Sequence, residues 1–240
     1  MLEASKRELS QTEVDSFAKK LADIYDYPRS LINFEWNNER MPAAWKTREE
    51  LSPGAVIEDN RCAIEYAQRV HRWGFNNTSI RKSVLHNHKF ETCLFKLIGE
   101  WQKPDGVLER ENAKTTLRSL LDIPGVGLAT ASKWICFLDQ QRYAIYDSRV
   151  SYALQQLKCD ESGRAFPFVG SRVGNNRRRE TVNGDTCVSS PDRAVITYLN
   201  FLAVIRKTAK ILAGYQETRN WSAGLVECCL FVEGKSRSKN

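Results

Sequence analysis

Apolar residues recur every three or four positions along most of this chain, and this spacing constrains the fold more than any other feature. Between residues 59 and 73, for example, one helical face carries Ala63, Tyr66, Ala67, Val70 and Trp73. The same spacing predicts eight helices, over about 12–25, 59–73, 90–101, 111–121, 128–138, 148–157, 192–213 and 221–232. The alternation typical of strands is nearly absent outside 143–146. The sequence therefore predicts an all-α fold.

Length and composition are those of a folded globular protein. The 240 residues suffice for one large domain or two smaller lobes. Apolar residues make up 42% and charged residues 27% of the chain, which argues against wholesale disorder. The 36 Lys and Arg exceed the 29 Asp and Glu, which gives a net charge of +7. An anionic partner is therefore worth testing, although charge alone does not identify one.

The sequence predicts a cytoplasmic protein, nucleoid-associated if it is prokaryotic. No apolar run approaches the roughly 20 residues that span a bilayer, so we expect no membrane association. Residues 1–17 also lack the apolar core of a signal peptide. The seven cysteines are odd in number and form no C-x2-C pair, so we expect reduced thiols that mostly fill the core.

Two connections differ in composition from the helical segments. Residues 74–88 are polar and suit a surface loop with one short helix. Residues 158–191 contain four glycines and the basic run Arg177-Arg178-Arg179, and they lack a helical apolar face. A loop of this length is usually functional or disordered, so we expect either a solvated flap or a disordered insert.

The stretch from Leu120 to Ala131, LLDIPGVGLATA, is the most informative part of the sequence. A helix runs into Pro124, Gly125 and Gly127 follow, and a second helix opens at once, which predicts a tight helix-hairpin-helix. The glycines permit close backbone approach, and the first turn of the second helix offers unpaired N–H groups to a phosphate. The same tetrapeptide is also compatible with an ordinary corner between two helices.

A carboxylate stands twenty residues after Gly127. Asp147 follows the apolar run 143–146 and precedes Ser148 and Arg149 at the start of a predicted helix. Taken alone, Asp147 is compatible with a simple helix N-cap.

The hairpin and this aspartate together resemble the helix-hairpin-helix superfamily of DNA glycosylases (HhH-GPD), which includes the eight-oxoguanine glycosylases and endonuclease III. In that family, the pattern L-P-G-V-G-x-K-T-A is followed eighteen residues after its lysine by the catalytic aspartate. Here I-P-G-V-G-x-x-T-A is followed by Y-D-S-R-V, with Ala129 at the lysine position and Asp147 eighteen residues further on. The resemblance covers about residues 120–150.

The resemblance implies a two-lobed helical fold with a DNA cleft between the lobes. One lobe would be a helical barrel over 56–140, with the helix-hairpin-helix at about 112–138. The other would combine 1–55 with 141–240, including the basic insert 158–191. The implied activity is excision of a damaged or modified base from double-stranded DNA by a monomeric enzyme, leaving an abasic site. Base excision repair and antiviral defence are both compatible with that activity.

The chemistry of such a reaction accounts for the aspartate. Breaking a C1′–N bond builds positive charge on the sugar, which a nearby carboxylate stabilises while it orients or deprotonates water. The target base must first leave the stack, so the enzyme also needs a phosphate clamp and a residue that fills the gap. We therefore expect Asp147 to be catalytic.

The expected DNA contacts come from three parts of the chain. The hairpin would contribute phosphate contacts, with Lys133 adding a charge one turn into the second helix, and Arg149 follows the catalytic aspartate. Candidates for the gap-filling residue are Asn76, Asn77 and Asn87, which are equally compatible with simple turn formers. Trp73, Phe75 and Trp101 suit either a stacking wall or the core. The predicted DNA-binding residues are Pro124, Gly125, Val126, Gly127, Ala129, Thr130, Lys133, Asn76, Asn77 and Arg149.

One departure from the family pattern concerns the reaction product. Relatives that also cleave the strand form a Schiff base through the lysine that Ala129 replaces here, so we expect base excision without lyase activity. Lys133, one turn later, is the alternative nucleophile. The C-terminal cysteine cluster of some relatives is missing, and His86 and His88 lack a third ligand, so we expect no cofactor and no metal. We expect Glu227 to be a solvent-facing charge.

Other functions remain compatible with the sequence. The hairpin is also compatible with a non-enzymatic DNA-binding module, although such a module has no need of a carboxylate near phosphates. A helical scaffold with a basic face for an acidic protein is a third class. Among bases to be excised, the resemblance favours oxidised purines, and the basic insert suggests a bulky base such as glucosylated hydroxymethylcytosine in phage DNA.

Overall fold

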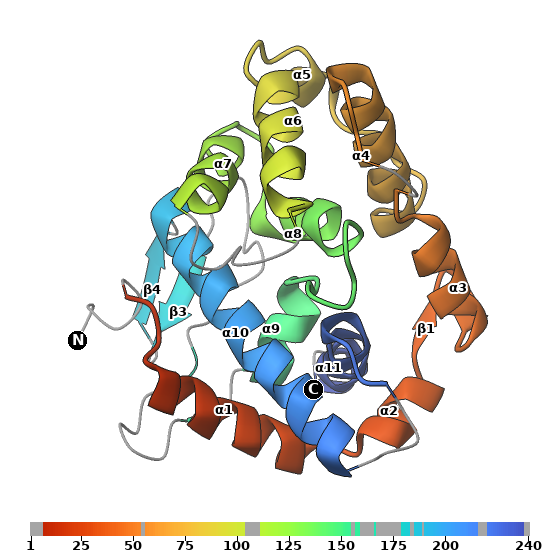
Figure 1. The fold of residues 1–240 in the computed structure, drawn as a ribbon, viewed down its shortest axis with the longest axis vertical. Helices are drawn as coiled ribbons and strands as arrows, with labels where there is room; N and C mark the ends of the chain where they lie inside the picture. Colours follow the sequence, from red (N-terminus) through yellow and green to blue (C-terminus); the bar gives the residue numbers. More distant parts are fainter. Residues whose placement is uncertain are drawn as a thin grey trace. The chain divides into compact units, whose positions relative to one another are not determined.

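A computed structural model describes residues 7–53, 56–103, 111–154, 157–158, 166, 179–182, 185–188, 190–215 and 220–237. The chain divides into two compact units (Figure 1). The continuous unit is Glu35–Ile145, and the split unit combines Met1–Phe34 with Tyr146–Asn240. The described part of each unit consists mainly of helices, so the predicted all-α class is confirmed.

The continuous unit is a helical body with one small β-hairpin. Its elements are β1 (Glu35–Trp36), β2 (Glu39–Arg40), α3 (Ala43–Glu50), α4 (Asn60–Gly74), α5 (Lys82–Leu85), α6 (Phe90–Trp101), α7 (Glu111–Leu121) and α8 (Leu128–Cys136). Helix α6 packs on α7 and α4, and α4 also packs on α8. The Asp59 side chain begins α4 by accepting a hydrogen bond from the Cys62 amide at 2.7 Å. The indole of Trp134 on α8 donates to the Ala67 carbonyl of α4 at 3.0 Å, which fixes these two helices together.

A buried arginine holds α3 in this unit. The Arg48 guanidinium lies within 5.5–5.6 Å of the ring centroids of Trp45, Trp73 and Phe137, and its Nε donates to Gln140 Oε1 at 2.9 Å. These contacts satisfy a charge that would otherwise be costly to bury. They hold α3 in the continuous unit, which begins at Glu35, whereas the resemblance implied a lobe over 56–140.

The split unit is built from the two ends of the chain. Its elements are α1 (Gln11–Ile24), α2 (Tyr27–Ile32), α9 (Ser148–Leu154), β3 (Arg179–Val182), β4 (Asp185–Val188), α10 (Pro191–Tyr215) and α11 (Ala223–Arg237). Helix α1 packs along α10, and α11 packs on α9 and α2 (Figure 1). A Cβ added at Gly234 would lie 1.8 Å from the Arg149 carbonyl oxygen, so α11 and α9 approach this closely only through glycine.

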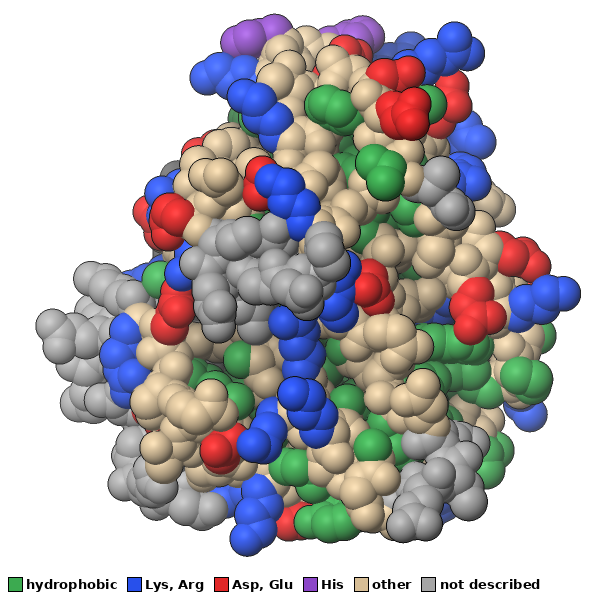
Figure 2. Space-filling model, in the orientation of Figure 1, with side chains coloured by type: hydrophobic (Ala, Val, Ile, Leu, Met, Phe, Trp, Pro, Cys, Tyr) green, Lys and Arg blue, Asp and Glu red, His purple; other side chains and the backbone are tan. Residues whose placement is uncertain are grey.

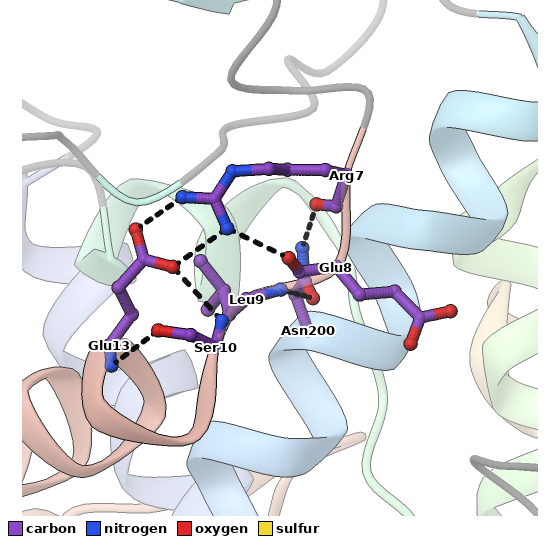
Figure 3. Close-up of polar contacts among 6 residues, drawn as sticks. All are labelled: Arg7, Glu8, Leu9, Ser10, Glu13 and Asn200. Carbon is purple, nitrogen blue, oxygen red and sulfur yellow. Dashed lines mark hydrogen bonds and ion pairs between the residues drawn. The ribbon is translucent and has the colours of Figure 1, made fainter.

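The N-terminal end of α1 is tied to α10 by a polar network (Figure 3). Ser10 and Glu13 form a reciprocal capping box, in which the Glu13 amide donates to Ser10 Oγ and the Ser10 amide donates to Glu13 Oε2. Arg7 pairs with Glu13 at 2.8 Å. The Asn200 side chain on α10 accepts from the Leu9 amide at 2.8 Å and donates to the Arg7 carbonyl. This network places the start of α1 against the middle of α10.

The eight predicted helices are confirmed as α1, α4, α6, α7, α8, α9, α10 and α11, and the short helix expected in 74–88 is α5. The strand-like alternation at 143–146 does not form a strand among the described residues, where these four residues are buried. The sequence also missed α2, α3 and the β1–β2 hairpin. Helix α1 ends at Ile24, and Pro28 lies in the first turn of α2, which Asp26 caps.

Part of the predicted insert forms two strands. β3 and β4 pair antiparallel, with Arg179 opposite Val188 and Val182 opposite Asp185. The expectation of a flap or a disordered loop otherwise falls outside the described residues, which include only 158, 166, 190 and 191 from the rest of 158–191.

None of the described helices is both long and apolar enough to cross a membrane.

Candidate functional site

The chain turns tightly between α7 and α8, at the predicted helix-hairpin-helix. The Ile123 amide donates to the Leu120 carbonyl at 3.2 Å, and the Val126 amide donates back to the Ile123 carbonyl at 3.0 Å. Gly125 has a φ of +94°, a conformation that side chains rarely adopt. The glycine of the motif is therefore required at this position.

Apolar side chains anchor the hairpin and leave its tip exposed. Ile123, Val126 and Leu128 are buried, whereas Pro124 and Gly125 are exposed. A Cβ at Gly125 would lie 2.9 Å from Val84 on α5, so the hairpin also packs against the loop that follows α4. The exposed tip offers no polar side chain that could recognise a base. The hairpin therefore suits a contact with the DNA backbone that does not depend on base sequence. The predicted DNA contact of Val126 lacks an exposed group, since the whole residue is 1% exposed and its amide donates to the Ile123 carbonyl.

The start of α8 leaves amide groups without partners. Gly127 is the N-cap, and its carbonyl accepts from the Thr130 and Ala131 amides at 2.9 Å each. No described residue accepts a hydrogen bond from the Leu128 or Ala129 amide, as expected for a first turn without a side-chain cap. These two N–H groups and the positive end of the helix dipole together suit an anion such as a phosphate.

The amine of Lys133 lies away from the exposed tip of the hairpin. The residue is 4% exposed, its Nζ donates to the Ala129 carbonyl at 3.2 Å, and it lies 4.8 Å from the centre of the Phe75 ring. Its methylenes cross Gly74, where an added Cβ would come within 2.5 Å of Lys133 Cδ. The expected phosphate contact of Lys133 therefore lacks the exposed ammonium on which it depends.

Asp147 caps α9 with one carboxylate oxygen. Its Oδ1 accepts hydrogen bonds from the Arg149 amide at 3.0 Å and the Val150 amide at 3.1 Å. No described residue donates to Oδ2, and the side chain is half-buried. The two readings of Asp147 are thus compatible, because the cap fixes the carboxylate and still leaves one oxygen to act on a ligand.

Arg149 is directed toward α11. Its guanidinium carbon lies 4.5 Å from the centre of the Phe231 ring, in a cation–π contact. The DNA contact expected of Arg149 stays a prediction, and it requires this side chain to leave the ring.

Asn76 and Asn77 form an exposed turn directly after α4. Their φ angles are 49° and 60°, and the Asn77 amide donates to the Arg72 carbonyl at 2.8 Å. The turn therefore displays both side chains on a fixed backbone. Asn87 differs, because its Oδ1 accepts from the Lys89 amide at 3.0 Å in an ordinary turn.

The aromatic candidates for a stacking wall belong to the core. Trp73 and Trp101 are buried, and the Trp101 indole donates to the Ala113 carbonyl at 3.3 Å. Phe75 is half-buried, with its ring 4.5 Å from that of His71. Burial, followed by the charges of Lys133 and Arg81, lowers the pKa of His71. The Nδ1 atom of His71 is buried and has no hydrogen-bond partner in the part of the chain that the structure describes.

Glu227 and the residue types that bind metals were the remaining points of interest. The expectation that Glu227 faces solvent is wrong, because it is 1% exposed on α11, a helix that packs on α9 and α2. Within the described part of the chain, His, Cys, Asp and Glu form no cluster that could hold a metal ion. His86 and His88 are both exposed.

One feature near the candidate site was not predicted. Asn37 and Asn38 form the tip of the β1–β2 hairpin, with φ angles of 50° and 66°. The signal was present in the sequence as an Asn-Asn pair between Trp36 and Glu39, but the flanking strands of two residues each are too short to show alternation.

Basic side chains gather on the split unit. Figure 2 shows blue Lys and Arg side chains over the region where α1 and α10 run. The basic residues in this part of the two helices are Lys19, Lys20, Arg206, Lys207 and Lys210. Lys207 in this group is paired with Asp15 at 3.0 Å.

Comparison of the chain with protein-family models, with curated proteins and with solved structures found no match.

Proposed function

We propose that this protein is a monofunctional DNA N-glycosylase, which flips a damaged or modified base out of duplex DNA and excises it. The observation that carries the proposal is the state of Asp147. Two backbone amides hold one of its oxygens, and the other oxygen has no partner among the described residues. A carboxylate that served only as a cap would need no fixed spacing from the hairpin, whose Ala129 stands eighteen residues before it.

The hairpin supports binding to a nucleic acid backbone. Its buried apolar side chains fix the exposed Pro124 and Gly125, and the Leu128 and Ala129 amides at the start of α8 have no acceptor among the described residues. Such a site binds phosphate through geometry and the helix dipole, without reading sequence. It would hold the duplex while the target nucleotide leaves the stack.

The reaction follows from this chemistry. As the C1′–N bond breaks, the base leaves with the bonding electrons and is protonated, and positive charge builds on the sugar. Asp147 stabilises that charge through Oδ2 and accepts a proton from the water that adds to C1′. The products are a free base and an intact strand with a hydroxyl at C1′. With Ala129 at the position of the lyase lysine, water and not an amine is the nucleophile.

The identity of the base stays open between two classes. Oxidised purines and bulky modified cytosines, such as glucosylated hydroxymethylcytosine, are both compatible with the proposal, the first in repair and the second in antiviral defence. A DNA cleft between two lobes and a monomeric, cytoplasmic enzyme stay predictions.

A lesion panel tests the proposal. The protein is incubated with duplexes that each carry one modified base, and the released bases are identified by mass spectrometry. We expect release of one class of base by the wild-type protein and none by Asp147→Asn. Duplex binding without release from any substrate would instead support a non-enzymatic helix-hairpin-helix module.

A further inference from the structure

Two asparagine pairs share an unusual backbone conformation in the continuous unit. Among the described residues, all non-glycine residues with a positive φ are asparagines: Asn37, Asn38, Asn76 and Asn77. Asparagine tolerates this conformation better than most residues, but glycine tolerates it best. Such conformations cluster at sites that bind ligands.

Both pairs are attached to the last turn of α4. The Trp73 carbonyl accepts hydrogen bonds from Trp36 Nε1 at 3.1 Å and from Asn37 Nδ2 at 3.3 Å. The Trp36 ring also stacks on the Trp73 ring, with centres 5.0 Å apart. Since Asn76 follows Trp73 by only three residues, the two turns lie close together and are fixed to the same helix end.

The choice of asparagine needs a reason beyond turn geometry. In a two-residue hairpin turn with positive φ at both positions, glycine is strongly favoured at the second position. Asn38 has that place in the β-hairpin, and Asn77 has the second place in the other turn. The side chains of Asn38, Asn76 and Asn77 are exposed and bond to no described residue. Each offers an amide donor and acceptor, which is the pairing that reads the edge of a base.

We propose that the Asn37–Asn38 turn is a second DNA-contacting element, which binds base edges exposed where the duplex is unstacked. The inference rests on the proposed function, which makes the neighbouring Asn76–Asn77 turn a candidate to fill the gap left by a flipped base. The uncharged amide of Asn38 suits a base edge better than a phosphate, and the carboxylates beside the turn already have partners: Glu35 lies 3.8 Å from Arg40, and Glu39 accepts from Thr47 Oγ1 at 2.7 Å.

The variant Asn38→Gly removes the side-chain amide while it keeps the backbone conformation of the turn. Glycine keeps the left-handed backbone, so the melting temperature should be unchanged or higher. Affinity of the full-length protein is measured by fluorescence anisotropy on two duplexes of one sequence, one intact and one with a tetrahydrofuran abasic analogue. We expect a roughly 2- to 10-fold loss on the abasic duplex, as for one neutral hydrogen bond, and no change on the intact duplex.

A matched control and a second variant complete the test. Asn60→Gly makes the same exchange at an exposed asparagine at the other end of α4, and should change neither affinity. Asn38→Asp tolerates the same backbone but lacks the N–H donors and adds a negative charge, so its loss on the abasic duplex should exceed that of Asn38→Gly.

Each outcome has one meaning. Unchanged affinities for both Asn38 variants would overturn the second element, as would an equal loss on the two duplexes, which would indicate a backbone contact. The proposed function is judged separately on base release by the wild-type protein. If the wild-type protein releases a base and Asn38→Gly binds normally, only the second element is wrong; if the wild-type protein binds neither duplex, both proposals are wrong.

Discussion

At the scale of single residues, the cap that Asp147 forms is compatible with the chemical role proposed for it. Capping uses one oxygen and fixes the direction of the other, so the structural role prepares the carboxylate for the proposed reaction. The sequence predicted both roles as alternatives, because a residue pattern does not show how two oxygens of one group are divided.

Asp147→Asn should preserve the fold and abolish base release. The asparagine carbonyl caps a helix about as well as a carboxylate, so the melting temperature should hardly change. The lost charge is needed mainly in the transition state, so release should fall roughly 100-fold or more in single-turnover assays. Asp147→Ala serves as control, because it also removes the cap and should cost about 1 kcal/mol of stability. Release by purified Asp147→Asn near the wild-type rate would refute the assignment.

The reaction should leave an intact abasic strand. Ala129 provides no amine, so strand breaks should appear only after hot alkali, and borohydride should trap no covalent complex. Lys133 is the alternative to exclude, because its Nζ lies 3.2 Å from the Ala129 carbonyl. A trapped adduct that disappears in Lys133→Ala would show that this lysine is the nucleophile. A trapped adduct that persists in Lys133→Ala would point to another amine and place the alignment of the hairpin in doubt.

At the scale of elements, the hairpin depends on Gly125. Gly125→Ala forces a Cβ to within 2.9 Å of Val84 and places a side chain at a φ of +94°. We expect a loss of more than about 1 kcal/mol in stability and weaker binding to intact and lesion-bearing duplexes alike. Gly99→Ala is the control, since that glycine lies in α6 with open space around it and should gain about 0.4–1 kcal/mol. Loss of binding to one lesion alone would contradict a phosphate contact.

The end of α4 should respond to acid through His71. Burial lowers the pKa of His71, and the charges of Lys133 and Arg81 lower it further, so the folded state favours the neutral ring. Folding stability is therefore highest above the ordinary histidine pKa of about 6.5 and falls as pH drops from there toward the lowered pKa. Chemical denaturation between pH 7.5 and 5 should show a smaller loss for His71→Gln than for the wild-type protein. Equal losses would show that another group dominates.

Long amphipathic helices were predictable, and short elements were not. α4 and α6 repeat their apolar spacing over three turns or more, so their limits came within a residue or two of the prediction. α2 has six residues and α3 has eight, which is too short for a periodic signal. α3 is held largely by the buried charge of Arg48 among aromatic rings, a tertiary contact that no local pattern encodes.

At the scale of the whole molecule, the sequence predicted a division into two helical units but not its limits. The segment 35–55 joins the continuous unit through contacts of Trp36 and Arg48 with residues far along the chain. The candidate site, too, was predictable only in part. The hairpin and Asp147 were visible as motifs, whereas the burial of Lys133 and the Asn37–Asn38 turn depend on packing that the sequence does not show.

The salt dependence of duplex binding tests whether the protein binds DNA through phosphate contacts. It also tests whether Lys133 makes one of those contacts. The net charge of +7 and the hairpin predict that the logarithm of affinity falls linearly with the logarithm of salt concentration, by about 0.9 for each phosphate contact. Because Lys133 is buried against Gly74 and Phe75, Lys133→Met should leave this slope unchanged, even if overall affinity drops through a less ordered α4 end.

A slope reduced by about one in Lys133→Met would show instead that the ammonium reaches a phosphate in the complex, as the sequence first suggested. Lys210→Gln gives the comparison for an exposed lysine on α10. If the protein binds no duplex even at low salt, the result would favour the remaining class, a helical scaffold whose basic surface binds an acidic protein. That class accounts for the positive charge without any DNA binding.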